Sequence, residues 1–195
     1  MKRLVAVLSA LALFGCSSQS VEQRVGSHKF LIPKRQLFRK QIFWLPFQDE
    51  GISFILNPDR QLPYQNAIEL STVTEICPRG VTPGDNPAAY LCSMKSIIHP
   101  SSTPIPSADL KKVMGDMGNA VWSYTLHDKD GDHVIASCSN AGPGEKRGGL
   151  CSGVAFYRDL MLTVHVREID IPRLPILVAT TQATLSKWEA DAAHS

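Results

Sequence analysis

The chain has 195 residues, of which 20 are basic and 18 are acidic, giving a formal net charge of +2. This near balance provides no strong positive field, so the composition argues against nucleic-acid binding. The length suits one domain with a sizeable core, and no apolar run after residue 15 approaches the ~18 residues of a membrane span.

The first fifteen residues have the layout of a secretory signal peptide. Lys2 and Arg3 are followed by Leu4–Phe14, an apolar run of eleven residues broken only by Ser9. Crossing a hydrocarbon core of roughly 30 Å takes about 20 residues, so this run is too short for a transmembrane helix. We therefore expect residues 1–15 to be a signal peptide that is removed.

The segment Leu13-Phe14-Gly15-Cys16 resembles the lipobox of bacterial lipoprotein precursors. The resemblance implies that the Cys16 thiol is alkylated by a diacylglycerol, that cleavage makes Cys16 the first residue, and that its amine is then acylated. Several acyl chains give stable anchoring, whereas a single chain is marginal. Because Ser17 stands where an inner-membrane lipoprotein of the enteric type has aspartate, the resemblance implies the periplasmic face of the outer membrane.

Loss of the signal peptide changes both the charge and the cysteine count. It takes 195 residues to 180 and, with Lys2 and Arg3, 20 basic side chains to 18, equal to the 18 acidic ones. With Cys16 lipidated, an even number of cysteines remains for disulfides in an exported chain: Cys77, Cys92, Cys138 and Cys151. Of three possible pairings we favour the local ones, Cys77–Cys92 and Cys138–Cys151, each contributing about 3 kcal/mol. The C-x-x-C spacing of a zinc site is missing, so we expect no metal and no cofactor.

We divide the mature chain into a lipidated cysteine with a flexible tether, residues 16–27, and a single globular domain, residues 28–195. The tether is polar and shows no periodicity. As a random coil, its eleven residues from Ser17 to Ser27 would span roughly 5–6 Å × √11, a little under 20 Å. The domain would therefore stand off from the membrane surface.

Alternating apolar residues predict strands in the first half of the domain: around Phe30 and Ile32, at Gly51–Asn57, at Ala67–Ile76 and at Tyr90–Met94. Residues 34–44 mix cations with aromatic side chains. They form either a surface patch for lipid headgroups or an acidic partner, or, as we favour, core aromatics with solvated cations beside them.

The second half of the domain begins with residues 99–107, whose three prolines exclude regular structure. Ser107–Gly115 has a serine cap and a glycine stop, which predict a short helix. Two hairpins follow: Val121–His127 with His133–Ser139 about Asp130-Gly131, and Leu150–Tyr157 with Asp159–Arg167, with Cys138 and Cys151 on neighbouring strands.

A helix opens at Ile171–Pro175, where prolines are tolerated in the first turn. Its apolar residues fall on one side at helical spacing: Leu174, Leu177, Val178, Leu185 and Trp188. The predicted fold class is therefore α+β, a mainly antiparallel, twisted β-sheet with a C-terminal helix packed on one face, stapled by disulfides.

Two segments have the composition of a ligand site. His127–His133 contains three aspartates, but its spacing is not that of an EF-hand loop, so we interpret it as a solvated hairpin tip. Asn140–Gly149 is glycine-rich but lacks the G-K-[ST] ending of a P-loop. We interpret it as a mobile recognition loop tied at its base by a disulfide, with Asn140, Glu145, Lys146 and Arg147 as candidate partner-binding residues.

A catalytic site is not indicated, because the chain has no G-x-S-x-G elbow and its paired cysteines offer no free thiol. We therefore predict a protein-binding module that captures a periplasmic protein through its exposed sheet face or the 140–149 loop. The anchor, size and layout resemble the periplasmic immunity lipoproteins of type VI secretion effectors, which implies a secreted toxin as the partner. The alternative is a structural or assembly lipoprotein of an envelope or secretion complex, and a hydrolytic enzyme comes third.

Overall fold

The computed structural model describes residues 20–37, 51–56, 66–72, 98–115, 118–128, 131–140 and 148–194. Several expectations lie outside these residues: the signal peptide, Cys16, the Cys77–Cys92 pair, the strand at Tyr90–Met94, and Glu145, Lys146 and Arg147 of the candidate loop.

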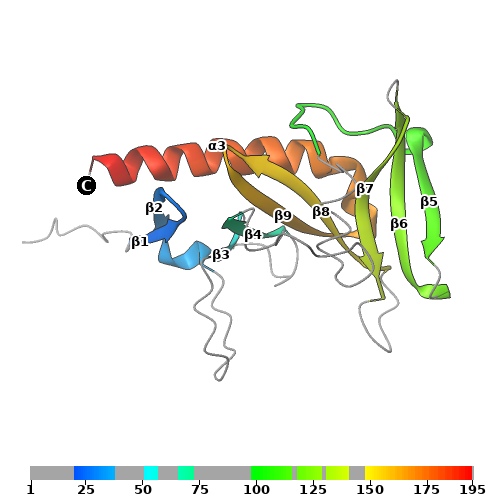
Figure 1. Cartoon of the computed structure of the whole chain (residues 1–195), viewed down its shortest axis with the longest axis horizontal. Coiled ribbons are helices and arrows are strands. Elements are labelled where there is room, and N and C mark those ends of the chain that lie inside the picture. The colour runs from blue at the N-terminus through cyan, green and yellow to red at the C-terminus, as the bar shows by residue number, and fades with distance from the viewer. Residues whose placement is uncertain are drawn as a thin grey trace, which may run out of the picture.

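Most of the described chain forms one twisted, seven-stranded antiparallel sheet crossed on one face by a C-terminal helix, as predicted (Figure 1). Its strand order is β3-β4-β9-β8-β7-β6-β5. The strands are β3 (Ile52–Ile55), β4 (Ala67–Thr72), β5 (Leu110–Gly115), β6 (Gly118–Asp128), β7 (Gly131–Ser139), β8 (Leu150–Tyr157) and β9 (Leu160–Arg167). A separate two-stranded hairpin contains β1 (Ser20–Val25) and β2 (His28–Pro33).

The predicted hairpins are confirmed at the centre of the sheet. Strands β8 and β9 pair from Leu150 opposite Arg167 to Tyr157 opposite Leu160. The alternation in β9 sends one set of side chains under the helix, where each is at most 1% exposed: Leu160, Leu162, Val164 and Val166. Period-two patterning therefore identified the face of the sheet that forms the core.

Helix α3 (Leu174–Ala193) follows a 3-10 segment, η3 (Glu168–Arg173). Its buried face carries Leu174, Val178, Leu185 and Trp188, the last of which meets the ring of Phe54 edge-on at 5.0 Å. Fully burying a large apolar side chain contributes roughly 1.5–3 kcal/mol, so this face holds the helix on the sheet. None of the described helices is long and apolar enough to cross a membrane.

The predicted helix at Ser107–Gly115 is wrong. Ser107–Asp109 forms one 3-10 turn, and Leu110–Gly115 is strand β5, paired with β6 from Leu110 opposite Leu126. A helix of two turns is marginal by itself, because nucleation costs more than so few hydrogen bonds return. The open edge of β6 offers this segment a ladder of backbone hydrogen bonds instead.

The predicted tether is wrong from residue 20 onward. Ser20–Val25 is strand β1, paired with β2 from Ser20 opposite Pro33 to Val25 opposite His28. Gly26 turns the chain with a φ of 56°, a conformation that glycine adopts at little cost. Glu22 and Arg24 of β1 are exposed, and only Val25 is fully buried. With only two apolar residues, Val21 and Val25, the strand shows no local pattern.

A histidine locks the β1–β2 hairpin to the rest of the domain. His28 Nδ1 lies 2.8 Å from Glu189 of α3, and its Nε2 lies 2.5 Å from Asp159 in the β8–β9 turn. Tyr157 donates to Glu189 at 2.7 Å, and Arg158 lies 3.0 Å from the same carboxylate. Three elements that are distant in sequence are joined by this network.

Replacing His28 by alanine is expected to lower the free energy of unfolding by about 1 kcal/mol near pH 6 and by less near pH 9. Its hydrogen bond to Glu189, followed by that to Asp159, raises the pKa of His28 above 6.5 despite burial. This stabilisation is fully present below pH 6.5 and is lost as the pH rises through the raised pKa. Denaturant unfolding of the parent protein and the variant at both pH values measures this stabilisation. If the substitution lowered the free energy of unfolding more at the higher pH, the proposed role of His28 would be contradicted.

Candidate binding surface

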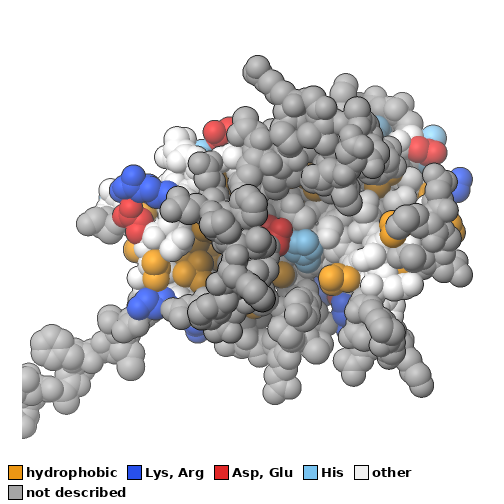
Figure 2. Space-filling model, turned by 60° about the horizontal axis from the view of Figure 1, so that its bottom comes forward, with side chains coloured by type: hydrophobic (Ala, Val, Ile, Leu, Met, Phe, Trp, Pro, Cys, Tyr) orange, Lys and Arg blue, Asp and Glu red, His pale blue; other side chains and the backbone are white. Residues whose placement is uncertain are grey.

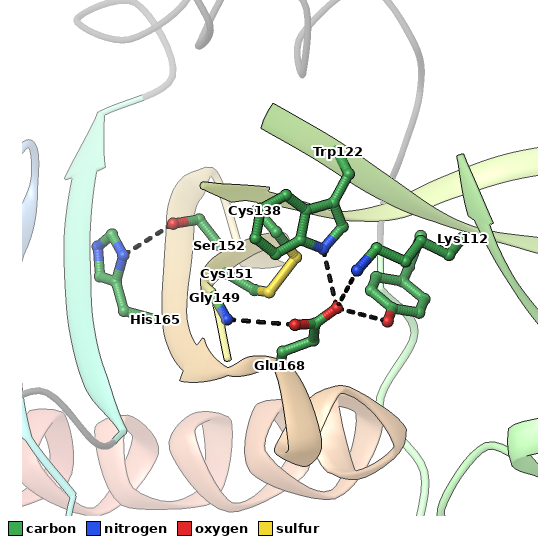
Figure 3. The surroundings of a disulfide bond; sticks show 9 residues. Lys112, Trp122, Cys138, Gly149, Cys151, Ser152, His165 and Glu168 are labelled. Carbon is green, nitrogen blue, oxygen red and sulfur yellow. Dashed lines mark hydrogen bonds and ion pairs between the residues drawn. A yellow bond between two sulfur atoms is a disulfide. The ribbon is translucent and has the colours of Figure 1, made fainter. Parts of the chain in front are cut away.

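A single carboxylate joins β5, β6, η3 and the base of the 140–149 loop (Figure 3). Glu168 opens η3 directly after β9. Its Oε1 accepts hydrogen bonds from Lys112 Nζ at 2.8 Å, Trp122 Nε1 at 3.0 Å and the Tyr124 hydroxyl at 2.7 Å. Its Oε2 accepts from the backbone N–H of Gly149 at 3.2 Å. We call these five residues the Glu168 corner.

The Glu168 carboxylate is stabilised in its ionised form by an ion pair with Lys112 and is largely shielded from water. Burial opposes ionisation of Glu168, but the hydrogen bonds from Lys112, Tyr124 and the Gly149 amide outweigh it and lower its pKa to about 2. Burial, together with the hydrogen bond to Glu168, raises the pKa of Tyr124 to about 12. Lys112 Nζ also lies 4.4 Å from the centre of the Trp122 ring, a cation–π distance.

Gly149 fixes the end of the loop against Trp122. A Cβ atom at this position would lie 2.2 Å from Cζ2 of the Trp122 ring and 3.0 Å from the Ser139 carbonyl oxygen, so only glycine fits. Its carbonyl accepts a hydrogen bond from the backbone N–H of Glu168 at 3.0 Å, while its own N–H donates to the Glu168 side chain. The N–H and the carbonyl group of Gly149 therefore both hydrogen-bond to Glu168 and hold the base of the loop in place.

The predicted disulfide between Cys138 and Cys151 is confirmed and lies beside this clamp. The two cysteines are directly opposite in the β7–β8 ladder and are at most 2% exposed. Of the candidate loop, the structure describes the exposed Asn140 and the glycines at its other end. The structure thus establishes a rigid base for the loop, and the partner-binding role of its charged residues stays a prediction.

Two exposed apolar side chains adjoin the Glu168 corner. Four large hydrophobic residues are exposed in the described chain, namely Val113 (39%), Met114 (46%), Val121 (36%) and Ile169 (76%). Met114 lies opposite Trp122 in the β5–β6 ladder, and Ile169 directly follows Glu168, so these two side chains adjoin the Glu168 corner. Val113 and Val121 alternate with the residues that bind Glu168 and therefore project from the other face of the sheet. Apolar residues that cluster on a surface beside polar ones mark interaction sites. This surface is the best binding candidate that the described residues provide.

The sheet face opposite α3 carries a serine, a histidine and a glutamate in a row. Figure 2 shows the molecule with the side away from α3 turned forward. Ser152 Oγ lies 2.9 Å from Nδ1 of His165, whose Nε2 lies 3.6 Å from Glu69 Oε2. The second distance is too long for a hydrogen bond. Ser152 also sits in a central strand with paired neighbours on both sides, whereas a hydrolytic nucleophile needs oxyanion donors next to it. We assign the three residues to the polar face of the sheet.

The histidines of the β6–β7 tip do not meet. His127 lies opposite Asp132 and its Nδ1 is 2.8 Å from that carboxylate, whereas His133 lies opposite Leu126 on the other face of the hairpin. His127 is 78% exposed, as the interpretation of a solvated tip requires. Within the described residues, no group of three or more His, Cys, Asp or Glu side chains is placed to hold a metal ion.

Comparison with known proteins identifies no family. No protein-family model matches the chain, and no curated protein matches its sequence. The chain is similar to a solved structure of an immunity protein of the Stenotrophomonas maltophilia type IV secretion system, with 14% identity and a TM-score of 0.46 over 88% of this chain and 93% of that one. At that level, the match establishes neither a shared fold nor a shared function.

Proposed function

We propose that the chain is a periplasmic protein-binding module that neutralises a secreted effector, and that acylated Cys16 anchors it to the outer membrane. The observation that carries the binding role is the pair of exposed apolar side chains, Met114 on β5 and Ile169 on η3, that adjoin the Glu168 corner. Protein interfaces combine an apolar centre with a polar rim, and this surface offers both on a braced scaffold.

The rigidity of this surface supports binding rather than a passive structural role. Glu168 fixes side chains from β5 and β6 and the end of the loop, and the Cys138–Cys151 disulfide holds the strands on either side of that loop. A surface that is ordered before it meets its partner loses less conformational entropy on binding. A neutralising protein needs such affinity, because its partner must be occupied before it acts.

Replacing Ile169 by aspartate is expected to weaken partner binding at least tenfold, because the new carboxylate would be buried without a counter-charge at the interface. Ile169 is 76% exposed, so the domain itself should fold normally. Ala183→Asp on the exposed side of α3 adds the same charge elsewhere and is the matched control. Cells that carry each variant are challenged with effector-secreting competitors, and survival is counted. Equal survival of both variants would contradict a role of this surface.

The alternative function, a structural or assembly lipoprotein of an envelope or secretion complex, predicts different binding partners. Crosslinking in intact envelopes followed by purification should recover one soluble, toxin-like protein if the chain neutralises an effector. Recovery of a multi-protein membrane complex would instead favour the assembly role. Deletion should impair growth only in cells exposed to the effector, so the same defect in a strain without any secreted effector would refute neutralisation.

The anchor is tested independently of the partner. Cys16→Ser should abolish labelling of the protein by radioactive palmitate in growing cells, because it removes the thiol that a diacylglycerol would alkylate. Labelling that persists in this variant would refute acylation at Cys16.

A further inference from the structure

The β1–β2 hairpin lies at the opposite end of the molecule from the candidate binding surface (Figure 1). The hairpin packs against α3, and Leu37, which follows the 3-10 turn after the hairpin, forms a bridge with Phe54 of β3. Strand β5 forms the other edge of the same sheet. The His28 lock makes the hairpin part of the rigid domain rather than of a flexible tether.

Covalent geometry places this hairpin close to the proposed anchor. Cys16 precedes the first residue of β1, Ser20, by four positions. Even a fully extended chain spans at most ~3.6 Å per residue, so the two lie no more than about 14 Å apart. Strand β2 returns to the same end of the hairpin, because its last residue, Pro33, lies opposite Ser20. Lys34 and Arg35 follow directly and are exposed.

The hairpin segment also carries an excess of basic residues. Residues 20–37 contain one acidic side chain and four basic ones, Arg24, Lys29, Lys34 and Arg35. The remaining mature chain then holds 14 basic and 17 acidic side chains of the 18 and 18. Glu22 lies 3.2 Å from Arg24 and 3.3 Å from Lys29, so it offsets only part of this charge.

We propose that the β1–β2 hairpin lies on the membrane surface, where Lys34 and Arg35 contact anionic phospholipid headgroups. This inference rests on the acylation of Cys16 proposed above. Basic residues near an anionic bilayer are attracted to it, and a basic patch beside acyl chains strengthens and orients an anchored protein. The domain then stands with its hairpin on the bilayer, and the Glu168 corner projects into the periplasm toward its partner.

The acylated protein, reconstituted in vesicles, tests this orientation through its own lysines. A neutral amine-acetylating reagent is applied, and the modification rates of Lys34 and Lys111 are measured by mass spectrometry. Lys111 lies on β5, at the far end of the domain, and is the internal control. Lys34 should react about tenfold more slowly on phosphatidylethanolamine–phosphatidylglycerol vesicles than on phosphatidylcholine vesicles, while Lys111 reacts equally on both. Arg35→Glu should return most of the Lys34 reactivity.

The outcomes separate this inference from the proposed anchor. Protein that floats with both kinds of vesicle and carries the acyl mass, but whose Lys34 reacts equally on both, would refute the docked hairpin and leave the anchor standing. Protein that neither floats nor carries acyl chains would refute the anchor, and the orientation with it. Protection of Lys111 together with Lys34 would overturn the proposed direction of the domain.

Discussion

Replacing Glu168 by alanine is expected to lower the free energy of unfolding by about 3 kcal/mol at neutral pH. Its pKa of about 2, against an ordinary 4.5, corresponds to stabilisation of that size by linkage. The side chain is 20% exposed, so solvent screens this contribution only partly. The substitution also leaves the Trp122 and Tyr124 donors without their acceptor. Denaturant unfolding of the variant and the parent protein measures the loss.

The pH dependence of this loss identifies its cause. Because the folded pKa of Glu168 is depressed, its stabilisation is present above pH 4.5 and is lost as the pH falls toward about 2. The difference between parent and variant should therefore shrink steadily below pH 4.5. Glu22→Ala removes an exposed, ion-paired glutamate and serves as the control, because solvent screening should leave the stability of that variant almost unchanged. A difference that does not change with pH would contradict the role of the charge.

Replacing both Cys138 and Cys151 by alanine is expected to destabilise the domain by about 3 kcal/mol, because the cross-link no longer restricts the unfolded chain. The cysteines lie next to the Glu168 corner, so the loop base should also loosen. Hydrogen exchange at Gly149 and Glu168, whose backbone amides are bonded there, should rise with the loss of stability. Unchanged exchange at both amides would contradict the structural coupling.

Reduction of this double variant tests the second predicted disulfide, which lies outside the described residues. If Cys77 and Cys92 are paired, a reducing agent should destabilise the variant further, since the variant retains only that cross-link. Reduction should lower the free energy of unfolding by about a further 3 kcal/mol, the value expected for a loop closed between Cys77 and Cys92. No response to the reducing agent would contradict the Cys77–Cys92 pairing.

Some of the fold could be predicted because its signals are local. Strands β8 and β9 alternate apolar and polar residues, a short turn fixes their register, and α3 repeats its apolar residues at helical spacing. The Cys138–Cys151 pair could be predicted because its cysteines flank one loop between neighbouring strands. In each case the residues that determine the structure lie within about a dozen positions of each other.

The errors arise where a distant partner decides the structure. Strand β5 has the caps of a short helix and became a strand through its pairing with β6, and β1 reads as a polar tether until β2 pairs with it. The Glu168 corner joins residues 19 to 56 positions apart. One hint of it existed in the sequence: Ile169, an apolar residue between two acidic neighbours just after a strand.

The sequence by itself determined the proposed location in the cell envelope, the cysteine count, and the strands and helix that show periodic apolar residues. Each of these depends on residues that are close together in the chain. The tertiary structure alone decided which surface is braced and exposed, and that the hairpin next to Cys16 belongs to the rigid domain. Both depend on the assembled sheet, because an edge strand, a shared carboxylate and a docked hairpin exist only once segments far apart in the chain have paired.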